Sequence, residues 1–134
     1  MSKRAQAVFE IKSWDEKPYA GLDGGPKFTR ASVTKSFDGD IVGEGTLEYL
    51  MYYHGDGSAS FVGLEHVVGR IGDRLGSFVL QHGGTFEGGA AKASWSVVRG
   101  SGTGDLRGLR GQGGFASAHA QNYAMMLDYD FEQV

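Results

Sequence analysis

The sequence predicts an all-β protein that folds as a closed antiparallel barrel of about eight strands. Two observations support this prediction. Apolar and polar residues alternate along most of the chain, which is typical of strands with two different faces. In addition, 23 glycines separate these segments, against only 2 prolines in 134 residues. Because aromatic and β-branched residues lie between the glycines, the pattern indicates turns, bulges and barrel corners rather than a flexible linker.

Four strands are expected in the N-terminal half. The first contains the alternation of Ala7, Phe9 and Ile11, and it runs through Trp14 into a loop from Pro18 to Pro26. Pairs of glycine and aspartate mark the turns that follow. The next three strands are expected at Lys27–Phe37, Ile41–Tyr53 and Ser58–Ile71.

The C-terminal half continues the same pattern. A glycine-rich connection at Gly100–Gly111 contains a short helical turn at Asp105–Leu109. Closure into a barrel is favoured over an open sandwich, because a closed sheet has no long unpaired edges. Residues 1–134 are expected to form one domain, which is long enough to bury a core. The last four strands are expected at Leu75–His82, Ala91–Arg99, Gln112–Ala118 and Asn122–Glu132.

Composition narrows the function classes. The net charge is −3 and the basic residues are scattered, so the basic footprint of a nucleic-acid-binding protein is absent. The lack of cysteine excludes disulfides, thiolate catalysis and cysteine-ligated metals. The chain contains neither the apolar stretch of a signal peptide nor a segment as long as a membrane span. We therefore expect a cytoplasmic protein that binds neither nucleic acid nor a membrane.

Three segments carry motifs that are specific in combination, namely Gly43–Met51, Gly63–Phe86 and Val98–Gly108. Together with the chain from Phe9 to Phe131, they resemble a bacterial protein family known as domain of unknown function 3224. That family is related in fold to allene oxide cyclase and dirigent-type barrels. The resemblance implies an eight-stranded antiparallel barrel with a ligand-sized interior. The related barrels steer a reactive substrate into one cyclised or coupled product, which carries cyclase chemistry to this chain only by analogy.

The candidate catalytic residues are two glutamates within strands, Glu48 and Glu65. If Asp56 and Gly57 form a two-residue turn, Glu48 lies directly opposite Glu65. Two facing carboxylates in a partly apolar cavity would raise the pKa of at least one and form an acid–base pair. A three-residue turn with a bulge would break this pairing. The alternative is that both glutamates face the solvent.

A second turn extends this predicted pocket. If residues 72–74 form a three-residue turn, Glu65 also faces Gln81, whose amide would orient a substrate oxygen. The other substrate-binding candidates are Phe61, Tyr52, Val67, Val79 and Trp95. If the opposite strand face lines the interior, the polar groups in the pocket become Tyr49, Tyr53, His66 and His82.

The chain offers no motif for a metal or a cofactor. Its four histidines match no compact ligand spacing and are expected at the surface or in hydrogen bonds: His54, His66, His82 and His119. The segment Gly100–Leu106 lacks the Gly-Lys-Ser/Thr ending of a phosphate loop, so a turn or bulge is expected there. We therefore expect no metal and no cofactor.

These observations predict an uncharacterised barrel that binds a hydrophobic small molecule. In one hypothesis it is a cofactor-free isomerase or cyclase in which Glu65 or Glu48 moves a proton. In the alternative it is a non-catalytic carrier or sensor of an apolar ligand, and in a third the interior is filled by side chains. A raised pKa of Glu65 would favour the enzyme. Because both strand faces are apolar, we also expect a homo-oligomer, either a dimer or a trimer.

Overall fold

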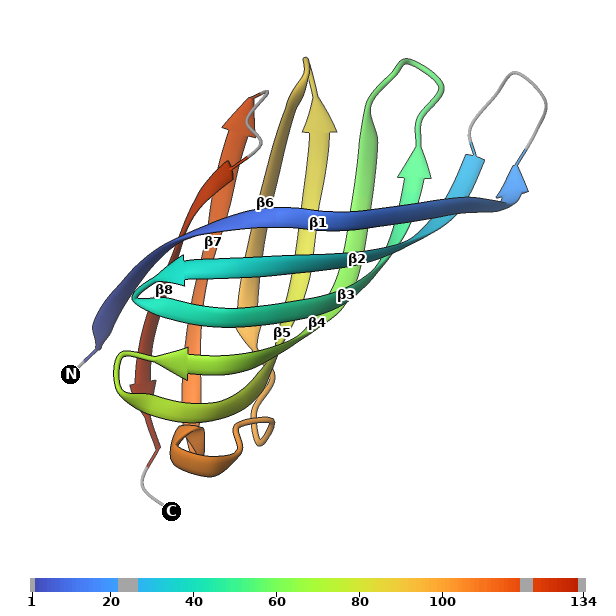
Figure 1. Cartoon of the computed structure of the whole chain (residues 1–134). Coiled ribbons are helices and arrows are strands. Elements are labelled where there is room, and N and C mark those ends of the chain that lie inside the picture. The colour runs from blue at the N-terminus through green and yellow to red at the C-terminus, as the bar shows by residue number, and fades with distance from the viewer. Residues whose placement is uncertain (1, 22–26, 119–121, 133–134) are drawn as a thin grey trace.

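Eight antiparallel strands form a closed barrel in which each strand pairs with its neighbours in the sequence and β8 pairs with β1 (Figure 1). The computed structural model describes residues 2–21, 27–118 and 122–132. The elements are β1 (Lys3–Gly21), β2 (Lys27–Gly39), β3 (Ile41–Tyr53), β4 (Ala59–Ile71), β5 (Arg74–Glu87), β6 (Ala90–Val97), the 3₁₀ helix η1 (Gly104–Leu106), β7 (Leu109–Ala118) and β8 (Asn122–Phe131). The predicted all-β barrel is confirmed. No helix in the described ranges is long and apolar enough to cross a membrane.

The first strand is longer than the sequence indicated. β1 continues through Trp14 to Gly21 and pairs with β2 along this extension. The predicted loop was therefore wrong for Pro18 to Gly21, while residues 22–26 lie outside the described residues. Pro18 is tolerated because a register shift follows it, and proline is found in strands mainly at bulges and edges.

A bulge in β1 decides which of its side chains face the interior. The register with β2 shifts between Ile11 and Ser13, which leaves Lys12 as an extra residue. Side chains alternate between the faces of a strand, so one extra residue exchanges the faces beyond it. Phe9 faces inward before the bulge, and Trp14 and Glu16 face inward after it. The bulge therefore brings an indole and a carboxylate into the barrel.

The hairpin between β3 and β4 sets a different register from the predicted one. Its loop has five residues, His54 to Ser58, and the His54 N–H donates to the Ser58 carbonyl at 3.0 Å. Leu47 consequently lies opposite Glu65, and Glu48 lies opposite Leu64. The predicted pairing of Glu48 with Glu65 was wrong by one residue.

The hairpin between β4 and β5 shows a second shift of the same size. Its turn is the two-residue Gly72-Asp73, with Gly72 at φ +62°, and Ile71 pairs with Arg74. Glu65 therefore lies opposite Leu80 rather than Gln81. A two-residue hairpin requires positive φ values that glycine adopts without strain.

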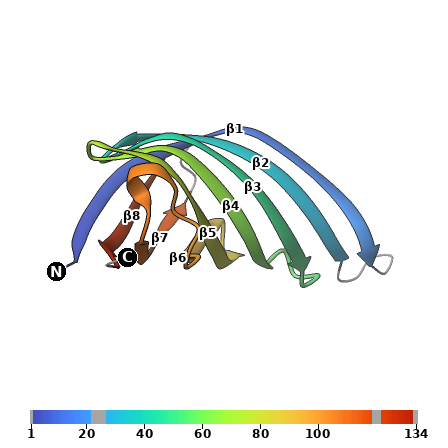
Figure 2. The same cartoon turned by 90° about the horizontal axis from the view of Figure 1, so that it is seen from below.

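The barrel interior is packed at one end and hollow at the other. At the packed end, buried apolar side chains form a continuous core, and η1 covers it with the fully buried Leu106. Figure 2 shows η1 at this end of the barrel, with β1 to β4 arching over the remaining strands. Toward the other end, a second apolar cluster that includes Leu47, Tyr49 and Phe61 lines the wall. The candidate site lies in the space that this second cluster encloses.

Candidate functional site

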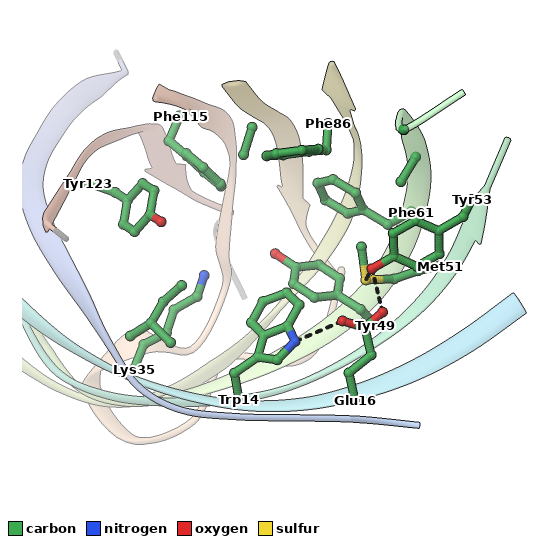
Figure 3. Close-up of a pocket in the computed structure, with 14 residues that line it drawn as sticks. Trp14, Glu16, Lys35, Tyr49, Met51, Tyr53, Phe61, Phe86, Phe115 and Tyr123 are labelled. Carbon is green, nitrogen blue, oxygen red and sulfur yellow. Dashed lines mark hydrogen bonds between the residues drawn. The ribbon is translucent and has the colours of Figure 1, made fainter. Parts of the chain in front are cut away.

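The hollow end of the barrel contains a cavity of about 360 Å³ (Figure 3). Its wall is mainly aromatic, with Trp14 from β1, Tyr49 from β3, Phe61 from β4, Phe86 from β5, Phe115 from β7 and Tyr123 from β8. Gly57 of the β3–β4 hairpin and the exposed rings of Trp14 and Phe86 lie at its opening. Two charged residues, Glu16 and Lys35, also line it. The cavity thus combines an apolar body with a few polar groups, which is usual for ligand pockets.

Three hydrogen-bond donors hold the carboxylate of Glu16 at the side of the cavity. Trp14 Nε1 donates at 2.9 Å, Thr29 Oγ1 at 2.6 Å and the Tyr53 hydroxyl at 2.5 Å. Burial alone would raise the pKa of Glu16, but these bonds outweigh it and hold the pKa below its usual value. Burial and the neighbouring carboxylate also raise the pKa of Tyr53 to about 12. Near neutral pH, Glu16 therefore presents a negative charge whose position is fixed by its donors.

A second carboxylate, Glu65, lies deeper in the barrel with two basic partners. Glu65 is fully buried on β4, His82 comes from β5 and Lys35 from β2. Glu65 Oε1 accepts from His82 Nε2 at 2.8 Å and from Lys35 Nζ at 3.4 Å. The Lys35 amine also lies 4.1 Å from the centre of the Phe9 ring. Of these three ionisable groups, only Lys35 lines the cavity.

The three buried groups change one another's protonation. Burial alone raises the pKa of Glu65, but Lys35 and His82 outweigh it and hold the pKa below its usual value. Burial lowers the pKa of Lys35, although Glu65 acts in the opposite direction. Burial also lowers the pKa of His82 against the effect of Glu65. Near neutral pH, Glu65 is therefore ionised and His82 is neutral, and the charge of Lys35 is the largest of the effects that lower the pKa of Glu65.

The neutral His82 connects Glu65 to a tyrosine at the cavity wall. Because an ionised carboxylate only accepts hydrogen bonds, His82 Nε2 carries the proton that is donated to Glu65. His82 Nδ1 then accepts from the Tyr49 hydroxyl, at the longer distance of 3.3 Å. Burial raises the pKa of Tyr49, so that this hydroxyl stays protonated. A continuous chain of contacts thus runs from Tyr49 through His82 and Glu65 to Lys35, and both of its ends line the cavity.

A glycine on β3 makes room for the buried carboxylate. Gly45 pairs with Lys35 on β2 and with Val67 on β4. A Cβ at Gly45 would lie 2.2 Å from Glu65 Oε2, which is far inside contact distance. Glu65 Oε2 is buried and has no hydrogen-bond partner among the described residues. Gly45 therefore leaves the space that this oxygen occupies.

Comparison with known proteins identifies the family. The family model described as "Protein of unknown function (DUF3224)" matches residues 5–129. The chain belongs to the DUF3224 family. The crystal structure of a protein with unknown function from this family, from Shewanella oneidensis MR-1, is 31% identical and has a TM-score of 0.83, covering 99% of this chain and 100% of that chain. No curated protein matches the chain significantly.

The family that the sequence motifs indicated is therefore confirmed. For the DUF3224 barrel, the solved relative supports the arrangement of strands over the whole chain. That relative is described as a protein with unknown function, so it assigns no role to any side chain. The kinship of the family with allene oxide cyclase-like barrels stays a prediction. The candidate site of the DUF3224 protein is consequently argued from its own residues.

Four of the predicted site residues face the interior of the DUF3224 barrel. Phe61 lines the cavity, and Glu65 lies behind the cavity wall. Val67 and Trp95 are buried in the packed core. Trp95 still contacts the site, because its ring centre lies 5.0 Å from that of His82.

The other four predicted residues face away from the cavity, as the shifted registers require. The side chain of Glu48 is 42% exposed and forms an ion pair with Arg30, in which Glu48 Oε1 lies 2.7 Å from Arg30 Nη2. Gln81 is exposed on the outer face of β5, and the half-buried Val79 shares that face. Tyr52 packs on the outside against Phe28 and His54. The structure thus separates Glu48 and Gln81 from Glu65.

The most informative polar residues of the site were missing from the predicted set. Lys35 continues the inward-facing alternation of Thr29, Ala31 and Val33, and this pattern was the available signal. His82 and Tyr49 belonged to the alternative in which the opposite faces line the interior. Glu16 was hidden by the bulge in β1, which no simple alternation reveals.

The histidines of the DUF3224 protein serve different roles. His82 belongs to the buried chain, His54 bonds Ser60 Oγ at 2.9 Å, and His66 is exposed. His119 lies outside the described residues. Within the described ranges, no group of three histidine, aspartate or glutamate side chains is placed to hold a metal ion.

Proposed function

We propose that this DUF3224 protein binds a small hydrophobic molecule inside the barrel. One observation carries the proposal, namely an open cavity of about 360 Å³ with an aromatic wall, in which only two of the lining residues that the structure describes are charged. Ligand pockets are commonly about 300–1,000 Å³ and are lined in this way. The predicted kinship with allene oxide cyclase-like barrels, which enclose ligand-sized interiors, agrees with the proposal.

The polar groups limit the chemistry of the ligand. Lys35 and Tyr49 offer donors on one side of the cavity, and Glu16 offers an acceptor near the opening. A ligand that fits these groups has an aromatic or aliphatic body and a carbonyl or hydroxyl oxygen directed toward Lys35. A second polar group that donates to Glu16 would add to its affinity.

Of the two predicted functions, the contacts favour binding over proton transfer by a glutamate. The pKa of Glu65 is lowered rather than raised, so this residue is not a neutral acid near pH 7. Lys35 rather than Glu65 contacts the cavity, and Glu48 is on the outer face. An isomerase or cyclase in which Glu65 or Glu48 directly abstracts a proton from the ligand therefore has no support from the geometry.

Two alanines on β6 provide a test of ligand binding. Ala91 lines the cavity, whereas its neighbour Ala90 lies on the opposite face of the same strand. The hydrophobic fluorophore N-phenyl-1-naphthylamine should bind the native protein with enhanced fluorescence. Ala91→Phe places a ring in the cavity and should raise the Kd at least about tenfold, a loss of about 1.4 kcal/mol. Ala90→Phe should leave the Kd within about twofold, which is about 0.4 kcal/mol.

The outcome is measured by fluorescence titration, with circular dichroism as a control for folding. If the native protein takes up no fluorophore, or if both variants lose affinity equally, the proposed cavity is not the binding site. A selective loss in Ala91→Phe supports it.

A further inference from the structure

The cavity contains a lysine that the binding of an apolar molecule does not require. Lys35 projects from the middle of β2, and its side chain is only 2% exposed. Burying an amine in an aromatic environment is unfavourable unless the charge is compensated. The chain has five other lysines, and the side chains of Lys12 and Lys17 are 53% and 80% exposed. Lys35 is therefore distinguished from these two by its place in the barrel.

The Lys35 amine is held loosely by its carboxylate partner. Its distance of 3.4 Å to Glu65 Oε1 is longer than the roughly 2.7–2.9 Å of a strong charge-assisted hydrogen bond. The same oxygen accepts the shorter bond from His82 at 2.8 Å. Three aromatic rings also lie near the amine, with the centres of Phe9, Trp95 and Phe115 within 5.9 Å of Nζ. An amine in such a site has lost most of its hydration and is available to a molecule in the cavity.

Tyr49 is placed to act on the same molecule. Figure 3 shows the Tyr49 hydroxyl and the Lys35 amine both pointing into the cavity. The bond from Tyr49 to His82 Nδ1 is long at 3.3 Å, so a ligand oxygen can compete for this hydroxyl proton. Behind the two groups, Glu65 Oε2 has no hydrogen-bond partner in the described part of the chain. The carboxylate thus keeps the capacity to take up a proton.

We propose that Lys35 condenses with the carbonyl group of a hydrophobic aldehyde or ketone in the cavity and forms a protonated Schiff base. This inference rests on the proposed ligand binding and names the class of ligand. Tyr49 donates a hydrogen bond to the carbonyl oxygen and polarises it. Glu65 takes up a proton from Lys35 and later returns it, and His82 holds Glu65 and Tyr49 in position through its two ring nitrogens.

The reaction balances with groups that are present in the site. Glu65 takes one proton from the ammonium of Lys35, and the nitrogen lone pair then forms a bond to the carbonyl carbon. Tyr49 passes its proton to the carbonyl oxygen and takes one from the nitrogen in exchange. A second exchange of the same kind accompanies the breaking of the carbon–oxygen bond, so that water leaves, and Glu65 returns its proton to the imine nitrogen. The nitrogen has lost two protons in total, which leave in the water, and Glu65 is ionised again.

The product preserves the electrostatics of the barrel. A protonated Schiff base carries the same positive charge as the lysine that it replaces, so Glu65 keeps a cationic partner. Since an unpaired buried charge is strongly destabilising, this pairing favours the protonated adduct over a neutral one. The aromatic wall offers few polar groups to hold water beside the new bond, which slows its hydrolysis.

Reductive trapping tests the proposal directly on the native protein. Incubation with trans-cinnamaldehyde and sodium cyanoborohydride near pH 7 should add one equivalent, with a mass gain equal to the aldehyde minus one oxygen atom. Peptide mapping should place it on Lys35, at a higher rate than on the exposed Lys12, because burial lowers the pKa of Lys35 and a lower pKa leaves more free amine. Lys35→Met should abolish this selective labelling, and Lys12→Met should not.

Displacement of N-phenyl-1-naphthylamine by the same aldehyde separates this inference from the proposed function. If the aldehyde displaces the fluorophore but Lys35 is labelled no faster than Lys12, the Schiff base is wrong and ligand binding stands. If the native protein does not bind the fluorophore either, both fail.

A variant of Tyr49 tests the role of its hydroxyl. Tyr49→Phe keeps the ring, so this variant should still bind the aldehyde. Labelling of Lys35 in the variant should be at least about tenfold slower, a modest loss compared with the usual effect of a general acid. An unchanged rate would contradict the role of Tyr49.

Discussion

At the scale of single residues, the structure is organised around the buried charge of Glu65. A carboxylate at this depth is tolerated because Lys35 balances its charge and His82 donates a hydrogen bond to it. Glu48, the other predicted catalytic carboxylate, satisfies its charge differently, through Arg30 and partial exposure to water. The two glutamates therefore offer a matched pair, one with its charge inside the barrel and one outside.

Removing the charge of Glu65 should destabilise the protein strongly. Glu65→Gln leaves the buried ammonium of Lys35 without a compensating charge, and breaking a buried ion pair in this way costs about 3–5 kcal/mol. Glu48→Gln removes an exposed ion pair and should cost no more than about 1 kcal/mol. Urea denaturation at pH 7 gives the free energy of unfolding of each variant.

The double variant Lys35→Met, Glu65→Leu provides a further control. Replacing both partners by apolar groups removes the uncompensated charge, so much of the stability lost in Glu65→Gln should return. Equal losses in Glu65→Gln and Glu48→Gln would contradict the assignment of Glu65 as a buried, ionised residue.

The residue scale also shows what alternation in the sequence does and does not reveal. The inward position of Glu65 followed from its apolar flanks, and the structure has it there. Lys35 lies within an equally regular inward-facing series, but lysine is almost never fully buried without a partner. Its partner comes from β4, and contacts between distant strands are not encoded in local alternation. The charge pair could therefore be recognised only after the strands were placed.

At the scale of the elements, strand positions were more predictable than strand registers. The bounds of β3 were predicted as Ile41–Tyr53 and are observed there, because the flanking glycines and aspartates mark both turns. The register depends on the exact length of each turn, and one residue exchanges the faces of the partner strand. The loop His54–Ser58 and the turn Gly72-Asp73 differ in length from the predicted turns, and each difference shifts the register of the paired strands by one residue. This is why Gln81 was placed in the pocket and His82 was not.

The short helix η1 is the element that closes the packed end. Leu106 is fully buried beneath β5. Gly76 allows the Thr103 carbonyl oxygen to approach closely, because a Cβ at Gly76 would lie only 2.0 Å from that oxygen. The Thr103 hydroxyl also bonds Ser77 Oγ at 2.7 Å, which fixes the connection to the barrel. One leucine thus completes the core at the end opposite to the cavity.

Truncation of this leucine should reduce stability without altering the cavity. Leu106→Ala removes buried methyl groups and leaves a void, which typically costs about 2–5 kcal/mol. Leu75→Ala, at a residue that is 62% exposed, should change the free energy of unfolding by no more than about 0.5 kcal/mol. Thermal and urea denaturation measure the loss. At a temperature where Leu106→Ala is folded, its affinity for N-phenyl-1-naphthylamine should match that of the native protein, and a large change would show that the two ends of the barrel are coupled.

At the scale of the whole molecule, the closed sheet divides the interior between stability and binding. The packed half supplies a continuous apolar core, while the hollow half has an ion pair and a neutral histidine at its inner wall. Closure gives every strand two neighbours, although β1 beyond Glu10 pairs with β2 and no longer with β8. The stability of the entire barrel is therefore linked to the protonation of a few buried groups.

This linkage should make the protein less stable as the pH falls below about 6.5. The pKa of His82 is lowered from 6.5 in the folded barrel, chiefly by burial and further by Lys35, against the opposite effect of Glu65. Below the unfolded pKa, the unfolded chain binds a proton that the folded chain does not, so the free energy of unfolding decreases. A second decrease follows below about 4.5, because the lowered pKa of Glu65 makes the unfolded chain protonate first.

Variants of two histidines test whether His82 causes the first decrease. The amide of a glutamine can donate to Glu65 and accept from Tyr49, so His82→Gln keeps both hydrogen bonds without a group that titrates. Its free energy of unfolding should change less between pH 6.5 and 5.5 than that of the native protein, by up to about 1.4 kcal/mol for one proton. His66→Gln, at an exposed residue on β4, should retain the native slope. Urea denaturation at several pH values measures these slopes, and the same slope in both variants would mean that the buried chain does not control the acid sensitivity of the barrel.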